Sequence, residues 1–298
     1  MIEDIIVKVL IGLGAAIMVV NVIGYIIFLY RMKDVISSGR KSDNVWLVLG
    51  LVLLVFFLTG YIVVASVFDP ALLTAFILFF GSLFVSIMLL ITSRLLVTAK
   101  TRSLEIAQLL IDVVDERDPN LCGHSSHVKN IVMLFYRYLP FHIRASINPI
   151  SLEYASLMHD IGKLGVPEAI LNKPAKLTDE EWEIMKKHPK LGVKFLDKVE
   201  TFNSVKDWIL YHHEREDGYG YYGMDPMNVP LPAKIIAIAD TYSAITMKRS
   251  YKDSKTHEEA IEIIKQVSGT QLDSELVDMF LNIPKEDLLN CMPDKLKE

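Results

Sequence analysis

The side chains best suited to chemistry begin with the adjacent pair His159-Asp160, which opens the pentad HDIGK. The preceding run from Ile150 to Met158 has apolar residues spaced for one face of a helix, so the pair comes at the end of a rigid element. A buried carboxylate is unfavourable unless it is paired or bound to a metal. Neighbouring helical positions point about 100° apart, so His and Asp can reach one ion together only at a helix end or by bridging. The pair alone fits either a shared metal ligand or a capping Asp beside a buried His.

More candidate ligands lie where other helices are expected to end or converge. The full set has five histidines and two aspartates: His124, His159, His188, His212, His213, Asp160 and Asp240. Imidazole and carboxylate suit iron, manganese or zinc better than copper or an iron–sulfur cluster. The set therefore indicates a metal centre. His127, one turn from His124, is expected behind the ligands or at the surface.

The first third of the chain is far more apolar than the rest. The 298 residues are 51% hydrophobic, with a mean hydropathy of +0.32. The excess lies in three runs that contain no Asp, Glu, Lys or Arg: Val9 to Tyr30, Val45 to Phe68 and Ala71 to Ser93. Each run is long enough to cross about 30 Å of hydrocarbon as a helix. The acidic start Met1-Ile2-Glu3-Asp4 argues against a cleaved signal peptide. We expect three transmembrane helices.

Basic residues set the expected orientation of these helices. The first loop holds Arg31, Lys33, Arg40 and Lys41, the second loop has none, and Arg94, Lys100 and Arg102 follow the third run. Because loops rich in Lys and Arg stay in the cytoplasm, the N-terminus is expected outside and everything after Ser93 inside.

The pattern of the remaining chain indicates helices without strand alternation. A connecting helix over 95–117 could pass a signal inward or pair with a second copy as a parallel homodimer. Further helices are expected over 123–138, from Thr178 to about Lys187, from Leu191 after a break at His188-Pro189, over 202–214, and over 231–247, 257–267 and 273–282. Gly and Pro predict a loop over 217–232. The expected fold is all-α: a transmembrane region (1–94), the connecting helix (95–117) and a cytoplasmic helical domain (118–298).

Charge and cysteine content exclude some partners and bonds. The net charge is -5 and no basic stripe stands out, which argues against a nucleic-acid polymer as a partner. The two cysteines, Cys122 and Cys291, lie on the expected cytoplasmic side, so no disulfide is expected.

Five segments after Asp112 form a recognisable set: NLCGHSSHV, HDIGKLGVPEAILNKPAKLTDEEWEIMKKHPKLG, HHEREDGYGYYG, IAIADTYSAITMKRSYK and SGTQLDSELVDMF. Together they resemble the HD-GYP branch of the HD superfamily of metal-dependent phosphohydrolases. The resemblance implies an all-helical domain with a site for two or three metals, usually iron or manganese. It also implies hydrolysis of the bacterial second messenger cyclic di-GMP to pGpG or GMP. The expected location is therefore a bacterial inner membrane, crossed several times.

The resemblance assigns roles residue by residue. It makes His124, His159 and Asp240 ligands of one metal and His188, His212 and His213 ligands of the other, with Asp160 bridging. Three-metal members carry Glu four residues before the first His, where this chain has Asn120, so a binuclear site is expected. Lys163 falls where the family's lysine approaches the scissile phosphate. Substrate-binding positions are matched by Tyr221, Arg249 and Lys252.

One departure bears on substrate choice and rate. The family's Gly-Tyr-Pro is Gly220-Tyr221-Tyr222 here, and the following loop is shorter and lacks a second Gly. Proline fixes φ and stiffens a turn, so Tyr222 is expected to change the loop over the substrate and leave the metals unaffected. Two alternatives stay open. The domain could bind the dinucleotide or a partner protein without turnover, or it could hydrolyse another cyclic dinucleotide or a nucleotide.

Overall fold

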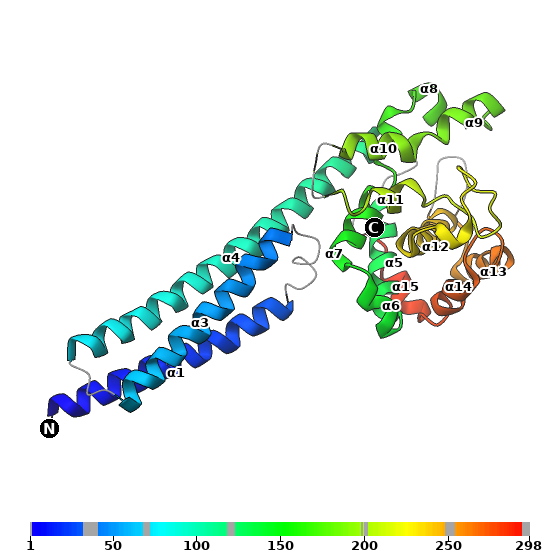
Figure 1. Ribbon diagram of the computed structural model, residues 1–298. Coiled ribbons are helices and arrows are strands. Elements are labelled where there is room, and N and C mark those ends of the chain that lie inside the picture. The colour runs from blue at the N-terminus through cyan, green and yellow to red at the C-terminus, as the bar shows by residue number, and fades with distance from the viewer. Residues whose placement is uncertain are drawn as a thin grey trace. The chain divides into compact units, whose positions relative to one another are not determined.

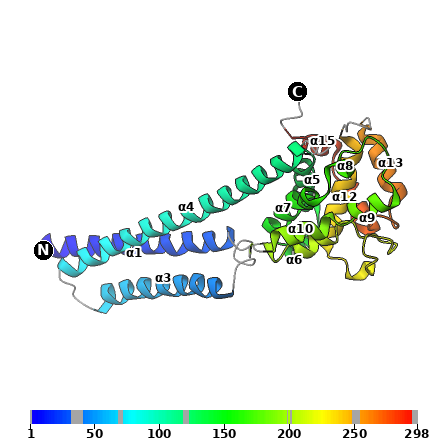
Figure 2. The same cartoon turned by 90° about the horizontal axis from the view of Figure 1, so that it is seen from above.

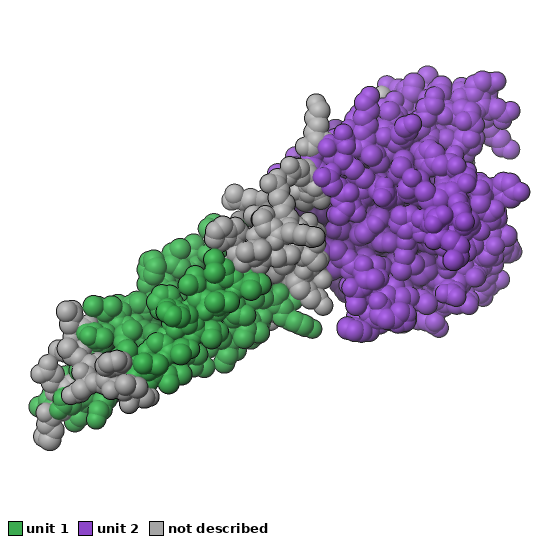
Figure 3. Space-filling view, viewed as in Figure 1, with its two compact units in different colours: residues 1–103 green, residues 104–298 purple. Residues whose placement is uncertain are grey.

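The computed structural model describes residues 2–31, 41–67, 72–117, 123–197, 199, 202–247 and 254–293. Within these residues every regular element is a helix, and the single β-bridge joins Ser268 to Leu272. The expected all-α fold class is therefore confirmed. The chain divides into two compact units, Met1–Ser103 and Leu104–Glu298 (Figure 3). The division falls inside the expected connecting helix.

The first unit contains α1 (Ile2–Arg31), α3 (Lys41–Val67) and the first part of α4 (Leu72–Arg117). These helices pack through apolar side chains such as Met18, Leu54 and Tyr61. A polar contact also joins α1 to α4, because the Asn21 amide donates to the carbonyl of Ser82 at 3.3 Å and accepts from Ser86 Oγ at 2.8 Å. The buried amide of Asn21 is thus satisfied by a neighbouring helix, as a polar group in an apolar bundle must be.

Two of the three expected transmembrane helices have the required length and composition. The apolar spans are Asp4–Tyr30 in α1 and Thr74–Leu95 in α4, and only 28% and 11% of their most apolar windows are buried in the protein. The described apolar stretch of α3 is shorter, Val48–Val64. The expectation of three spans is therefore supported for two, and the third stays a prediction.

The second unit is a helical domain built around α5 (His124–Tyr138), which packs against α7 (Pro149–Met158) and α12 (Leu231–Thr246), as Figures 1 and 2 show. The last turns of α4 add Ala107, Ile111 and Val114 to the same core. The C-terminal helices α13 (His257–Val267), α14 (Ser274–Phe280) and α15 (Lys285–Leu289) close it. Shorter elements follow the chain around this core: α6 (Phe141–Ser146), η2 (Ile161–Gly165), α8 (Glu168–Leu171), α9 (Asp179–Met185), α10 (His188–Leu196), α11 (Lys206–Leu210) and η4 (Pro226–Asn228).

Several expected helix boundaries were wrong, among them the start of α10 and both ends of α11, which begins at Lys206 instead of 202. Helix α10 begins at His188 rather than after Pro189, because a proline in the first turn of a helix gives up an N–H that would lack a partner anyway. Helix α11 ends at Leu210 instead of Glu214. The physical reason is that His212 Nδ1 donates a hydrogen bond to the carbonyl of Ile209 at 2.6 Å. For the helix to continue, the N–H of His213 would need the same carbonyl as its acceptor.

Gly162 allows η2 and α10 to touch backbone to backbone. A Cβ atom at Gly162 would collide with the carbonyl of His188 and with the amide nitrogen of Gly192. A Cβ at Gly192 would be only slightly tight, at 3.3 Å from Gly162 N. The close approach brings His188 beside the His159-Asp160 pair, so a residue without a side chain is needed at position 162.

Gly162→Ala should therefore destabilise the second unit. Overpacking of this kind costs about 1–3 kcal/mol, and here the neighbouring atoms belong to backbone that cannot rotate away. We expect a lower unfolding midpoint in thermal denaturation followed by near-UV circular dichroism. Gly192→Ala is the matched control and should lower the midpoint less. Equal midpoints for the two variants would contradict the backbone contact.

Candidate metal centre

The His159-Asp160 pair lies at the end of α7, as its sequence pattern predicts. The helix ends at Met158, and Asp160 leaves the helical conformation at φ -98° and ψ 2° before η2 begins. This break lets the two side chains converge, with His159 Nε2 at 3.4 Å from Asp160 Oδ2. Both residues are buried. The pair is therefore a rigid, desolvated source of one nitrogen and two oxygen donors.

A first group of donors forms where α7 meets α5 and α12. His124, at the start of α5, places Nε2 at 3.0 Å from Asp240 Oδ1 on α12. His159 Nε2 lies 4.0 Å from the same oxygen. One donor atom from each of these three residues lies within 4.8 Å of the others. The spacing suits a single ion held by two imidazoles and a carboxylate.

A second group lies on the other side of Asp160. His188 Nε2 is 3.1 Å from Asp160 Oδ1, and donor atoms of His212 and His213 complete a set within 4.8 Å. Asp160 Oδ2 faces the first group instead, at 3.4 Å from His159 Nε2 and 4.0 Å from His124 Nε2. The structure thus brings all seven predicted ligands together in two groups, with one carboxylate oxygen of Asp160 facing each.

Main-chain carbonyls orient three of the imidazoles. The Nδ1 atoms of His159, His188 and His212 donate to the carbonyls of Ser156, Met185 and Ile209 at 2.7, 3.0 and 2.6 Å. Because a carbonyl only accepts, Nδ1 carries the proton and the Nε2 lone pair points into the centre. These three Nε2 atoms are buried and make no hydrogen bond within the described residues. Buried nitrogens that lack a hydrogen-bond partner and lie near carboxylates fit a divalent cation well, since a bound metal would satisfy each of them.

His124 is oriented differently, by a side chain that the sequence did not identify. Ser243 Oγ lies 2.9 Å from His124 Nδ1 and 3.0 Å from His127 Nδ1, so one hydroxyl can donate to one ring and accept from the other. Burial, and then repulsion from His124, lower the pKa of His127 to about 3, so this ring is neutral. His127 therefore lies behind the ligands, as expected. Ser243 lies one turn after the predicted ligand Asp240 on α12, and this spacing is the sequence feature that could have placed it near the metal centre.

The electrostatics of the cluster favour an ionised Asp160 and a neutral His213, the forms that bind metals. Burial opposes ionisation of Asp160, yet Lys163 and His159 hold its pKa well below the usual range. Burial and then His188 lower the pKa of His213 to about 3. Burial lowers the pKa of His159, but Asp160 and Asp240 outweigh it and raise that pKa. The two carboxylates thus attract positive charge, which a bound cation would supply in place of a proton.

Lys163 and Tyr221 lie at the edge of this centre. Lys163 Nζ donates to Asp160 Oδ2 at 2.7 Å, and its side chain is 16% exposed. The ring of Tyr221 packs on His213, with centroids 4.4 Å apart. Both residues line a cleft of about 640 Å³ that also reaches His124, Asp160 and Asp240. The predicted substrate-binding residues Arg249 and Lys252 lie outside the described residues.

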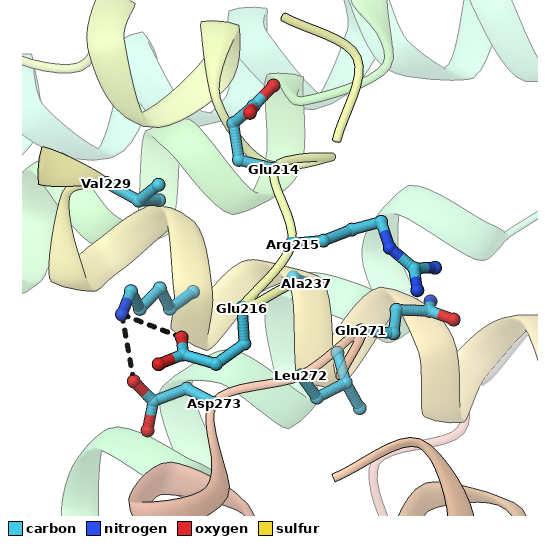
Figure 4. Close-up of a pocket in the computed structure, with 9 residues that line it drawn as sticks. Glu214, Arg215, Glu216, Val229, Ala237, Gln271, Leu272 and Asp273 are labelled. Atoms are coloured by element: carbon cyan, nitrogen blue, oxygen red, sulfur yellow. Dashed lines mark hydrogen bonds and ion pairs between the residues drawn. The ribbon is translucent and has the colours of Figure 1, made fainter. Parts of the chain in front are cut away.

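Glu214 holds the loop that carries Tyr221. Its buried carboxylate accepts the backbone N–H of Tyr222 at 2.7 Å and that of Met224 at 2.8 Å. Gly220 is needed because a Cβ there would lie 2.6 Å from Glu214 Cα. Farther along, Lys234 pairs with Glu216 at 3.0 Å and Asp273 at 2.9 Å (dashed lines in Figure 4). Sequence patterns alone do not identify a role for Glu214, and in the structure its carboxylate positions the loop.

Comparison with known proteins places this site in a family. The HD domain family matches residues 108–276, which include all seven clustered ligands. The chain belongs to the HD domain family. It is similar to a cyclic di-GMP phosphodiesterase of Thermotoga maritima, with 40% identity over 138 residues, 45% of this chain and 38% of that protein. It is also similar to the 3'3'-cGAMP-specific phosphodiesterase 2 of Vibrio cholerae, with 32% identity over 191 residues, 63% of this chain and 36% of that protein.

Among solved structures, the HD domain of the L. monocytogenes phosphodiesterase PgpH in complex with cyclic-di-AMP matches with a TM-score of 0.44 and 18% identity. That match covers 63% of this chain and 97% of the other. The chain spans less than two fifths of the length of the two curated relatives. The match of the HD domain family to residues 108–276 confirms the predicted resemblance at the level of the HD domain.

Ser243→Ala should weaken metal binding, because His124 would lose the group that fixes its ring. Removing a hydrogen-bond partner behind a ligand costs about 10–100-fold in metal affinity. Isothermal titration of the metal-free chain with Mn²⁺ would measure the loss. Ser156→Ala is the matched control, since that hydroxyl donates to the Glu153 carbonyl and the substitution keeps the Ser156 main-chain carbonyl that orients His159. Equal affinities for the two variants would contradict a role for Ser243.

Tyr222→Pro should loosen the Glu214 contact, because proline has no N–H to donate. A hydrogen bond to a charged group is worth about 1.5–3 kcal/mol. We expect faster hydrogen exchange at the Met224 amide, which shares the same carboxylate. Tyr222→Phe keeps the backbone N–H and should exchange like the unaltered chain. Unchanged exchange in the proline variant would show that Glu214 does not hold this loop.

Proposed function

We propose that the chain is a membrane-bound, metal-dependent phosphodiesterase that hydrolyses cyclic di-GMP to pGpG, GMP or both. The observation that carries the proposal is the shared carboxylate of Asp160, which has one oxygen toward each group of ligands. Sites with two neighbouring cations suit in-line displacement at phosphorus. The activities named for the Thermotoga and Vibrio relatives support a cyclic dinucleotide as the substrate.

In this proposal the two ligand groups hold the two metals, iron or manganese. His124, His159 and Asp240 hold one ion, His188, His212 and His213 hold the other, and Asp160 bridges them. The grouping of donor atoms within 4.8 Å supports this assignment. Bound there, the cations would supply an activated water and stabilise charge on the phosphate at neutral pH.

The chain's own residues then position the diester. Lys163 faces the cleft beside Asp160 and can turn to a non-bridging phosphate oxygen once Asp160 is shared with a cation. Burial raises the pKa of Tyr221, so its hydroxyl stays a neutral hydrogen-bond donor on the cleft wall. Arg249 and Lys252 are proposed to complete the binding of phosphates and bases.

We further propose a bacterial inner-membrane location, with the N-terminus outside and the HD domain in the cytoplasm. The largely exposed apolar surfaces of Asp4–Tyr30 and Thr74–Leu95 support insertion into a membrane. Residues 95–117 of α4 are proposed to pair with a second copy of the chain. Their outward apolar side chains, spaced three or four apart, support this: Ile106, Leu109, Leu110 and Val113 are each at least 47% exposed.

A second cyclic dinucleotide is also a candidate substrate. The Vibrio relatives named as 3'3'-cGAMP-specific favour it, and the altered loop at Tyr222 leaves the choice of base open. The remaining alternative is a domain that binds the dinucleotide without turnover. Against it, all seven predicted ligand positions carry a residue that can bind a metal.

The full chain, purified anaerobically in detergent with Mn²⁺ or Fe²⁺, should convert cyclic di-GMP to pGpG or GMP. Chromatography of the nucleotides would measure this conversion. Asp160→Asn should lower kcat by about 100-fold or more, since it removes charge at the reacting centre. Chelation should abolish turnover and added Mn²⁺ should restore it. Asp197→Asn, at a carboxylate 71% exposed, is the control. Binding of cyclic di-GMP without cleavage would refute the enzyme and favour the signalling module, whereas faster cleavage of 3'3'-cGAMP would reassign the substrate.

A further inference from the structure

The cleft at the metal centre has two lobes. The first lobe, of about 640 Å³, contains Lys163 and the segment from Ile170 to Leu177. The second lobe, of about 540 Å³, contains Thr241 and Gln271. Both lobes are lined by Trp182, His213, Tyr221 and Asp240. Each volume lies in the range of about 300–1,000 Å³ typical of small-ligand pockets, so each lobe can take one half of a dinucleotide.

Trp182 stands on the boundary between the lobes without a role in the core. It lies on α9, a helix in which no side chain is buried, and its own side chain is 45% exposed. Its ring meets the edge of Tyr221, with centroids 6.2 Å apart and planes at 83°. A tryptophan used for folding would be largely buried. This indole instead leaves apolar surface open at the mouth of the cleft.

The helix that carries Trp182 is nevertheless fixed in place. A capping box joins Thr178 and Glu181, and Lys173 Nζ contacts the same Glu181 carboxylate at 2.5 Å. These contacts tie the start of α9 to the loop that lines the first lobe. The indole is therefore held ready before a ligand arrives, which limits the entropy lost on binding.

We propose that Trp182 is the base-stacking residue of this site. One nucleobase of a cyclic dinucleotide packs on its indole in one lobe, and Tyr221 separates that base from the second base in the other lobe. This assignment rests on the proposed function and adds a specificity-determining residue to it. Stacking on an aromatic ring tolerates any base, so Trp182 selects nucleotide diesters and does not distinguish guanine from adenine.

The test uses the full-length chain in detergent with Mn²⁺, comparing Trp182→Ala, Trp182→Phe and Phe141→Ala. Phe141 is an exposed aromatic residue, 74% accessible, that lines neither lobe. Affinity for a phosphorothioate analogue of cyclic di-GMP is measured by titration calorimetry, which needs no turnover. Trp182→Ala should weaken binding roughly 10-fold, Trp182→Phe should recover most of the loss, and Phe141→Ala should bind like the unaltered chain.

Two further readouts separate stacking from damage to the metal centre. The affinities for Mn²⁺ and for inorganic phosphate, which has no base, should be the same in all four proteins. In the unaltered chain the nucleotide analogue should quench indole fluorescence more than phosphate does, and Trp182→Phe should remove that difference. Equal loss of phosphate and nucleotide binding, or unchanged nucleotide binding in Trp182→Ala, would overturn the proposal.

Failure of the proposed function gives a different result. A chain that binds the analogue through Trp182 yet cuts no cyclic dinucleotide would contradict the phosphodiesterase and keep the stacking role. An unaltered chain that binds neither cyclic di-GMP nor 3'3'-cGAMP analogues would overturn the stacking proposal.

Discussion

Two carboxylates, one buried and one partly buried, impose the electrostatic requirement around which the second unit is built. Asp160 and the 18% exposed Asp240 lie among imidazoles at the meeting point of α5, α7 and α12, where desolvation makes an unpaired negative charge unfavourable. Lys163 offsets part of the charge at 2.7 Å from Asp160. The imidazoles cannot supply the rest by taking protons together, because burial and mutual repulsion lower the pKa values of His212 and His213. In the proposed function, a cation bound in each group would balance this charge without protonating the rings.

Hydrogen bonds at helix ends help to meet this requirement by orienting the histidine rings. The last carbonyls of a helix have no partner within the helix and must find a donor elsewhere. Near the ends of α7, α9 and α11 the donor is the Nδ1–H of a histidine three residues beyond the carbonyl. Each of these bonds satisfies an orphan acceptor and turns Nε2 toward the carboxylates. Gly162 completes the arrangement by letting α10 approach η2 closely enough for His188 to join.

Sequence patterns predicted the features that depend on local rules. The helix ending before His159, the capping box at Thr178 and the seven candidate ligands all follow from residue type and spacing, and the structure brings those seven together. Ser243 was not assigned because its partners His124 and His127 lie on a helix distant in sequence. Glu214 was not assigned because its partners are backbone N–H groups of the following loop, whose path residue types do not specify. The end of α11 was missed for a related reason: a side chain, His212, takes the acceptor that propensity assigns to the backbone.

The loop at Tyr222 shows how a departure from a family pattern can preserve a position by other means. A proline there would fix φ by its ring, but it would have no N–H for Glu214. Tyr222 gives up the fixed dihedral and donates that N–H, so the Glu214 carboxylate holds the loop at Tyr222 and Met224 together. Because Gly220 packs directly on Glu214, the two contacts confine Tyr221 between them. Tyr221 can then stay against His213 without proline, with a hydrogen bond to a charged group in place of a covalent constraint.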